Sequence, residues 1–448
     1  MNRLLLFFLI LWTACTQSPP SSSTVSIPYL KTDVIPLQDL HSHGASIVEL
    51  PNGDLLSAWF QGSGERWADD VAIIGARLLK GDTAWSKAFV MADVPAFPDI
   101  NPALFLDSQG RLWLAWYTVL ANLWETSLPK YRISENFMMK EGPPEWKWQE
   151  VLHVKPGGST ERGIQPSDPF VLSVERQMKE YESYLMDTLG GNEEWLQAYR
   201  AWAHDKLGKA RGDDQQFKGY LYGENGEITK QKMGFPLFRR IGWQTKNKAI
   251  LVDQQRLILP LYSDGLGFSL MAITDDDGES WQFSSPIVGL ENIQASIVQK
   301  KNGHLVAYMR DNGPPPQKMQ MSVSTDKGLN WGKVRDSEIL NPGSGADMIV
   351  LENGHWVLAY NDTEEGRHSL AVSISEDEGK SWPYLRHIAY DAGPGENRIR
   401  AGYPSAIQSK DGLIHVIYSY TSRRKEDKKQ ECIKYIRFEE DWVREGDA

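Results

Sequence analysis

The fold of this chain is decided by one short phrase, Thr274-Asp-Asp-Asp-Gly-Glu-Ser-Trp281, which returns as Ser324-Thr-Asp-Lys-Gly-Leu-Asn-Trp331 and as Ser375-Glu-Asp-Glu-Gly-Lys-Ser-Trp382. The three copies start 50 and 51 residues apart, a period typical of repeat proteins built from small sheets. In the shared pattern, Ser/Thr-x-Asp-x-Gly-x-x-Trp, the Asp can accept backbone N–H bonds within a tight turn. The Gly can adopt positive φ, and the Trp buries a large apolar surface after the turn. The phrase therefore predicts a repeated turn between strands.

A second repeated pattern sets the number of repeats. In it a turn residue precedes a strand-like apolar run, and six copies occur, the sixth with Gln in place of Gly. Runs rich in β-forming residues and opened by turn residues are typical of strands in repeated sheets. We therefore predict an all-β fold, a six-bladed β-propeller over residues 31–445. The six runs begin at Gly53, Gly110, Gln255, Gly303, Gly354 and Gly412.

Composition and charge exclude several functions. The 448-residue chain has 17 Trp and a formal net charge of −11, which argues against a nucleic-acid partner or an anionic membrane surface. The sequence has no His/Cys cluster at metal-ligand spacing and no phosphate-cradling glycine loop. We therefore expect neither a metal nor a cofactor.

The N-terminus has the layout of an export signal. Arg3 precedes an apolar run that is too short to span a membrane, and Thr13-Ala-Cys15 follows it. Small residues before a single Cys resemble a bacterial lipoprotein processing site. We predict a signal peptide over residues 1–15, a lipid on Cys15 and a tether over 16–30, with membrane contact only through that lipid. The protein would then be anchored at the bacterial cell envelope; the alternative is a periplasmic or secreted chain.

One long interval interrupts the repeats, between Gly110 and Gln255. Within it Met178, Tyr181 and Leu185 recur at helical spacing, and a second apolar stripe follows. We predict a helical hairpin over about 168–210, inside an insertion of about 168–240. The alternatives are a lid or partner surface at the rim of a pocket, or a hidden seventh blade.

The repeated phrase is the Asp-box of sialidases, and the chain resembles the bacterial sialidase-like BNR-repeat family over residues 40–440. Runs similar to that family include Asn101-Pro-Ala-Leu-Phe105 and Asn341-Pro-Gly-Ser-Gly345. The resemblance implies a six-bladed propeller whose active site lies at one end of its central channel.

The resemblance also implies a set of site residues. Sialidases grip the sugar carboxylate with three Arg, attack the sugar with a Tyr and use an Asp as acid and base. The positions that match are Asp70 for the acid, Arg310 and Arg367 for two of the Arg, and Tyr403 for the nucleophile. Each has a structural alternative: a turn Asp, solvated charges closing a strand, or an ordinary ring in the channel wall.

Three positions depart from the family pattern. Pro404 follows the candidate nucleophile, and Glu291 is one residue away from the place of the Glu that activates it. His43 stands where the first Arg is expected. A His can carry charge or transfer protons near neutral pH, so it could still bind a carboxylate; a hydrogen-bonded loop His is the alternative.

These residues favour a sialidase-like exo-glycosidase that removes a terminal acidic sugar, with Asp70, Tyr403 and Glu291 as catalytic residues and His43, Arg310 and Arg367 as substrate-binding residues. A lyase acting on uronic-acid glycans is an alternative, with His43 and Tyr403 as base and acid. A non-catalytic glycan-binding surface lipoprotein is a third hypothesis. All three have a carbohydrate as partner.

Overall fold

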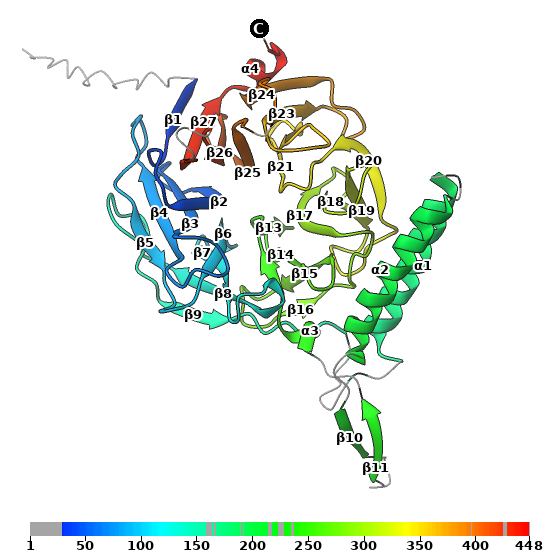
Figure 1. Ribbon diagram of the computed structural model, residues 1–448. Helices are drawn as coiled ribbons and strands as arrows, with labels where there is room; N and C mark the ends of the chain where they lie inside the picture. Colours follow the sequence, from blue (N-terminus) through cyan, green and yellow to red (C-terminus); the bar gives the residue numbers. More distant parts are fainter. Residues whose placement is uncertain are drawn as a thin grey trace, which may run out of the picture.

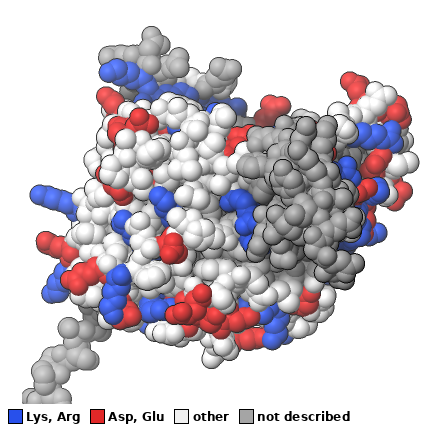
Figure 2. Space-filling model, turned by 90° about the horizontal axis from the view of Figure 1, so that it is seen from below, with Lys and Arg blue, Asp and Glu red and all other residues white. Residues whose placement is uncertain are grey.

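The computed structural model describes residues 29–447 except 158–163, 165–166, 189, 191, 214–216, 223–227, 234–236, 396 and 424–427. The predicted signal peptide, the lipidation of Cys15 and nearly all of the tether lie outside the described residues. Among the helices that the structure describes, none is long and apolar enough to cross a membrane. On the face shown in Figure 2, acidic and basic side chains are interspersed.

Antiparallel four-stranded units make up most of the molecule. The first sheet orders β2–β3–β4–β5, the second β6–β7–β8–β9, and another β21–β22–β23–β24. A nine-stranded sheet has two halves, β12 to β16 and β17 to β20, joined through one parallel pair, Phe268 with Asn292. In the last sheet, β1 pairs with β27 beside β26 and β25, so the first and last strands of the described chain close one unit together.

The sheets surround a common centre, with β2, β6, β17, β21 and β25 innermost (Figure 1). Strands near the centre, such as β2, β3, β6 and β7, are short runs of mostly buried residues, whereas the outer strands β9, β20 and β24 are mostly not buried. The strands are β1 (Leu30–Asp33), β2 (His41–Glu49), β3 (Leu55–Gly62), β4 (Ala72–Leu78), β5 (Phe89–Ala92), β6 (Asp99–Leu106), β7 (Leu112–Val119), β8 (Ser127–Ser134), β9 (Trp148–Val151), β12 (Gln244–Thr245), β13 (Ile250–Val252), β14 (Arg256–Ser263), β15 (Phe268–Thr274), β16 (Gln282–Phe283), β17 (Asn292–Gln299), β18 (Leu305–Asp311), β19 (Lys318–Ser324), β20 (Arg335–Leu340), β21 (Asp347–Val350), β22 (Trp356–Tyr360), β23 (Ser369–Ser375), β24 (Tyr384–Tyr390), β25 (Arg400–Gln408), β26 (Ile414–Thr421) and β27 (Glu431–Phe438).

The three repeated phrases form the same turn, as their sequence predicts. In the first, the Thr274 hydroxyl accepts the Gly278 amide at 2.8 Å, and the Asp276 carboxylate accepts the Ser280 amide at 2.9 Å. The other two copies repeat both bonds. Gly278 has a φ of 94°, and a Cβ there would lie 2.4 Å from the Trp113 ring of another unit. The glycine is therefore required both by the turn and by the packing between units.

The insertion contains two helices, α1 (Pro169–Thr188) and α2 (Glu193–Arg211), at the outer edge of the nine-stranded sheet (Figure 1). Asp168 caps α1, since its carboxylate accepts the Phe170 amide at 2.9 Å. The buried faces of both helices pack against strands β14 and β15, through residues such as Met178 and Leu185. The described part of the insertion also holds the pair β10 (Phe217–Tyr222) and β11 (Ile228–Met233) and the short α3 (Leu237–Arg240). These described elements are a helical hairpin and a two-stranded sheet rather than a seventh four-stranded unit. Two further short helices are η1 (Trp124–Thr126) and α4 (Glu440–Arg444).

Candidate active site

Four inner strands carry the same irregularity, and it shapes the centre of the molecule. The pairing register shifts at one bulge in each of β2, β6, β17 and β25. Each bulge holds one residue with positive φ, namely Gly44, Asn101, Gln294 and Tyr403, and each is followed by Ala or Pro and then by Ala or Ser. A bulge leaves a residue out of the ladder and re-aims its side chain. Because a bulge tolerates Pro, Pro404 fits this position.

The bulge side chains meet through hydrogen bonds near the centre. The Asn101 amide donates to the Tyr262 hydroxyl at 3.3 Å. The Gln294 amide donates to the same hydroxyl and to that of Tyr403, both at 3.2 Å. Residues from three separate sheets, including both halves of the nine-stranded sheet, thus form one connected group.

Tyr403 is the member of this group that contacts two guanidinium groups. Its hydroxyl oxygen accepts a hydrogen bond from Arg310 Nη1 at 2.7 Å, and the Arg367 guanidinium lies 5.0 Å from its ring centroid. Burial alone would raise the pKa of Tyr403, but Arg310 and Arg367 outweigh burial and lower it. The two cations stabilise the phenolate form. We call Tyr403, Arg310, Arg367, Gln294 and His43 the Tyr403 cluster.

The two arginines retain unused hydrogen-bonding capacity. Arg310 also donates to Asn312 Oδ1 at 2.6 Å, yet its buried Nε has no partner among the described residues. Arg367 donates to the Gly343 carbonyl at 2.9 Å, and burial lowers its pKa to about 10, so it stays cationic at neutral pH. Buried donors are almost always satisfied, by protein, water or ligand. Two neighbouring guanidinium groups are suited to an anionic ligand.

His43 joins the cluster as a neutral ring. Its ring centroid lies 4.2 Å from that of Tyr403. Burial, followed by the charges of His41 and Arg367, lowers the pKa of His43 well below its usual value. Burial also opposes charge on His41, but its hydrogen bonds to Glu431 and Glu65 raise the pKa of His41 to about 9. The adjacent imidazoles therefore differ in charge at neutral pH: His41 is cationic and His43 is neutral.

The two predicted catalytic carboxylates, Asp70 and Glu291, have no described hydrogen bond to Tyr403. Asp70 is exposed, and its carboxylate accepts hydrogen bonds from the Ser63 hydroxyl, at 2.7 Å, and from the Ser63 amide. These two hydrogen bonds lower the pKa of Asp70. Glu291 accepts Trp202 Nε1 at 2.6 Å and pairs with Lys206 Nζ at 3.3 Å, so its described bonds run to α2. The bonds described for the Tyr403 oxygen come instead from Arg310 and Gln294.

Three functional candidates were missed in the sequence. Gln294 takes the place beside Tyr403 that an activating Glu was expected to fill. Asp264 directly follows β14, and burial raises its pKa to about 6 although Arg310 opposes the shift. Lys246 donates at 2.7 Å to the carbonyl of Pro404, the residue after Tyr403. Burial lowers the pKa of Lys246 to about 7. Among these three residues, only Gln294 has a signal in the sequence. It is followed by Ala and then Ser, and each of the other bulge residues is likewise followed by Ala or Pro and then by Ala or Ser.

A cavity of about 470 Å³ borders the cluster. Its wall includes His43 and Arg367 from the cluster, Gly402 next to Tyr403, and Arg400. Its volume falls in the range of about 300–1,000 Å³ that is usual for pockets holding small ligands. We call it the Tyr403 cavity; its other wall residues are His41, Ser63, Gly64, Glu65, Trp67, Ala401, Ser419, Thr421 and Glu431.

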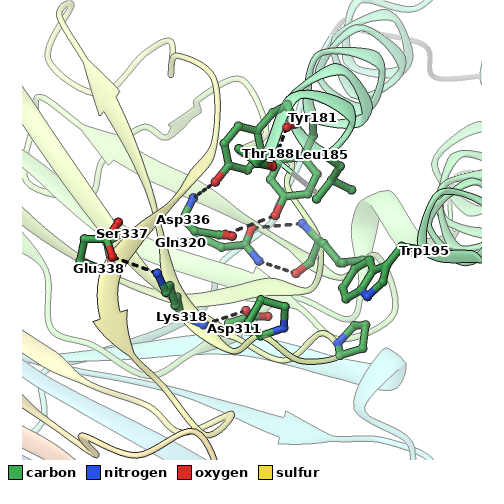
Figure 3. Close-up of a pocket in the computed structure, with 14 residues that line it drawn as sticks. Tyr181, Leu185, Thr188, Trp195, Asp311, Lys318, Gln320, Asp336, Ser337 and Glu338 are labelled. Atoms are coloured by element: carbon green, nitrogen blue, oxygen red, sulfur yellow. Dashed lines mark hydrogen bonds and ion pairs between the residues drawn. The ribbon is translucent and has the colours of Figure 1, made fainter. Parts of the chain in front are cut away.

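A second cavity, of about 260 Å³, lies between the hairpin and strands β18 to β20 (Figure 3). Its polar groups bond to the protein: Asp311 accepts the Gly313 amide at 2.8 Å, and Gln320 donates to the Leu290 carbonyl at 2.7 Å. Tyr181 donates to Asp336 at 3.4 Å. Because the Tyr181 bond joins the hairpin to β20 and the other polar groups are bonded within the sheet, we interpret this cavity as a packing seam and the Tyr403 cavity as the candidate active site.

Comparison with known proteins agrees with the fold. Residues 240–416 match a family model described as a BNR repeat-like domain. The resemblance to the sialidase-like BNR-repeat family is confirmed. No curated protein matches the sequence.

Solved structures with a similar fold cover most of the length of this chain. A protein of unknown function from Dyadobacter fermentans DSM 18053 has a TM-score of 0.58 at 14% identity, covering 92% of this chain and 100% of that one. The intramolecular trans-sialidase from Ruminococcus gnavus gives 0.55 at 14% identity, over 90% and 95%. A Trypanosoma rangeli sialidase with 2,3-difluorosialic acid as covalent intermediate gives 0.53 at 11% identity, over 88% of this chain and 54% of that one. At such identities the likeness concerns the fold.

Proposed function

We propose that the four-stranded units are the six blades of a β-propeller and that the Tyr403 cluster cleaves a terminal acidic sugar from a glycan. The observation that carries this proposal is the 2.7 Å bond from Arg310 to the Tyr403 oxygen, with the Arg367 guanidinium over the same ring. A nucleophile and two cations then stand together beside a cavity. The likeness to sialidase structures supports the same reading.

In the proposed reaction, Arg310 and Arg367 hold the sugar carboxylate, because planar guanidinium groups match a carboxylate with paired hydrogen bonds. Tyr403, with its lowered pKa, attacks the anomeric carbon, and the bond to the leaving oxygen breaks. Water then displaces Tyr403 from that carbon, which releases the free acidic sugar and restores Tyr403. The leaving oxygen must receive a proton. We assign this step to Asp264, which directly follows β14 and interacts electrostatically with Arg310 and with Tyr262, the residue that shares the Gln294 amide with Tyr403. Burial raises the pKa of Asp264 to about 6, so it holds a proton nearer neutral pH than Asp70, and its carboxylate then takes a proton from the incoming water.

A lyase reaction is the second candidate, and one observation favours it. Neutral His43 packs against Tyr403 at 4.2 Å, while the described hydrogen bonds to the Tyr403 oxygen come from donors rather than from a carboxylate base. A phenolate beside an arginine-bound carboxylate could remove the adjacent C–H proton of a uronate. The C4–O bond of the uronate would then break, the Tyr403 hydroxyl formed in this step would give its proton to the leaving oxygen, and an unsaturated sugar would remain.

One screen distinguishes these functions. Purified protein is incubated with sialosides and with uronate-containing oligosaccharides, and the products are identified by mass and by near-ultraviolet absorbance. We expect a free acidic sugar without new absorbance. An unsaturated product would replace the hydrolase assignment with the lyase. Binding of acidic glycans without any turnover would leave a glycan-binding protein and contradict both.

A further inference from the structure

The helical insertion contacts the loop before β17 through one carboxylate. Glu291 Oε1 accepts a hydrogen bond from Trp202 Nε1 at 2.6 Å and lies 3.3 Å from Lys206 Nζ. Both partners belong to α2. The buried Lys206 also donates to the Gly265 carbonyl at 3.2 Å, in the turn between β14 and β15. The described wall residues of the Tyr403 cavity all lie outside the insertion, so an effect of α2 on the site must pass through other residues.

The backbone of Glu291 is strained, and its neighbours hold it in this conformation. Its φ is 53°, in the left-handed region that is unfavourable for a residue with a Cβ. Such a conformation persists where the surrounding structure fixes it. Here the two contacts from α2 fix the carboxylate, and Gly267 leaves room for it, since a Cβ on Gly267 would lie 3.0 Å from the Glu291 carboxylate. The direction of the Glu291 carbonyl is therefore determined by these contacts.

Two hydrogen bonds connect the Glu291 carbonyl with Arg310. The carbonyl accepts the Asn312 amide at 3.1 Å, and Asn312 Oδ1 accepts Arg310 Nη2 at 2.6 Å. Arg310 Nη1 in turn donates to the Tyr403 oxygen at 2.7 Å. Because a guanidinium group is planar, fixing one of its nitrogens also fixes the directions in which the others donate. A continuous series of contacts thus runs from α2 to Tyr403.

We propose that the insertion positions Arg310, with Glu291 and Asn312 as positioning residues. This inference rests on the proposed function, in which Arg310 binds the sugar carboxylate beside Tyr403. Contiguous hydrogen bonds and ion pairs of this kind can transmit a change at one place to another. The insertion then supports the candidate active site from outside the cavity, and Glu291 acts through Arg310 without touching Tyr403.

The titration of Tyr403 reports the position of Arg310 without any substrate. Phenolate absorbance is recorded against pH for each protein and for the same protein carrying Tyr403→Phe, and the difference isolates Tyr403. Within the group of charged and titratable residues around Tyr403, Arg310 is the one joined to α2 through Glu291 and Asn312. This group is Arg310, Arg367, Glu65, His43, Lys246, Tyr117 and Tyr262.

Trp202→Phe removes the indole donor to Glu291. It should raise the midpoint of the Tyr403 titration by about half a pH unit or more, because a displaced Arg310 stabilises the phenolate less. Asn312→Ala, at an exposed position, should have the same effect and leaves α2 intact. Trp195→Phe is the matched control, since Trp195 lies on the same helix but lines the packing seam. If Trp202→Phe does not fold, Asn312→Ala decides the result.

A titration left unchanged by Asn312→Ala or by folded Trp202→Phe, or equal shifts in Trp202→Phe and Trp195→Phe, would overturn the inference. Turnover of acidic glycans by the wild-type protein separates this outcome from a failure of the proposed function. The expected shifts without any turnover would reject the proposed reaction and keep the positioning of Arg310. Turnover with unchanged titrations would keep the reaction and reject the positioning.

Discussion

At the scale of single residues, the proposed function depends on Tyr403 and on how its oxygen is stabilised. The side chain is nearly buried, yet two guanidinium groups lie against it and lower its pKa. These contacts form because the bulge in β25 gives Tyr403 a φ of 52°, outside the usual strand conformation.

Replacing Tyr403 by Phe removes this oxygen alone. We expect turnover of the acidic substrate to fall by about 10²–10⁴-fold, as for loss of a group that transfers protons or bonds in the transition state. Tyr418→Phe on β26 is the control, since the buried Tyr418 hydroxyl has no hydrogen-bond partner among the described residues. Steady-state kinetics on both variants check this; equal activity of Tyr403→Phe and Tyr418→Phe would refute the assignment.

Asp264 gives a prediction about pH. As a general acid it must be protonated, and its pKa is about 6, so activity should fall as pH rises through about 6. Asp264→Asn should abolish that limb of the kcat/KM profile and lower the plateau. Asp70→Asn serves as comparison, because the pKa of Asp70 is lowered by its bonds to Ser63. If the limb vanishes in Asp70→Asn and persists in Asp264→Asn, the proton donor is Asp70.

At the scale of elements, the bulges of the inner strands determine which side chains meet. Gly44 occupies the bulge of β2 with a φ of 66°, and a Cβ there would lie 2.5 Å from Asn101 Oδ1 and 2.8 Å from the Phe60 ring. The bulge next to His43 therefore admits only glycine without displacement of its neighbours.

Gly44→Ala should lower the free energy of unfolding by about 1–3 kcal/mol, because it adds a clash to an unfavourable φ. Gly412→Ala is the matched control: its φ is 86°, but no atom lies within 4 Å of the added Cβ. Urea unfolding of both variants measures the difference. A loss in Gly412→Ala as large as that in Gly44→Ala would show that backbone conformation, and not packing at the bulge, is the cause.

The seam between the hairpin and the sheet responds to pH through Asp311. Burial raises the pKa of Asp311 to about 7, so the folded state keeps a proton that the unfolded chain has lost. Its contribution to stability therefore falls as pH rises from the usual carboxyl pKa toward 7. Asp311→Asn should reduce the loss of melting temperature between pH 5 and pH 8, whereas Asp187→Asn on the exposed part of α1 should not. An unchanged pH dependence in Asp311→Asn would contradict this account of the seam.

At the scale of the whole molecule, the sequence was informative where structure is local or periodic. The Asp-box turns depend on bonds within eight residues, and the hairpin helices on a regular spacing, so both could be predicted. Arg310, Arg367 and Tyr403, more than ninety residues apart at the extremes, could be placed together because the repeat gives the register of each strand.

The remaining contacts of the site could not be predicted because they depend on bulges and on long-range packing. Gln294 reaches Tyr403 only because both residues leave their ladders. Glu291 contacts Trp202 and Lys206 of the insertion. The repeat pattern does not predict where the insertion packs, so these contacts could not be predicted. The raised pKa of Asp264 likewise arises from burial in the assembled centre.

The most direct measurement of the central claim is covalent trapping. The protein is incubated with 2,3-difluorosialic acid, digested, and analysed by mass spectrometry, with Tyr403→Phe as control. If Tyr403 is the nucleophile for an acidic sugar, we expect a glycosyl adduct on the peptide that contains Tyr403. The Tyr403→Phe variant should lack this adduct. An adduct on another residue, or binding of the reagent without any adduct, would contradict the claim.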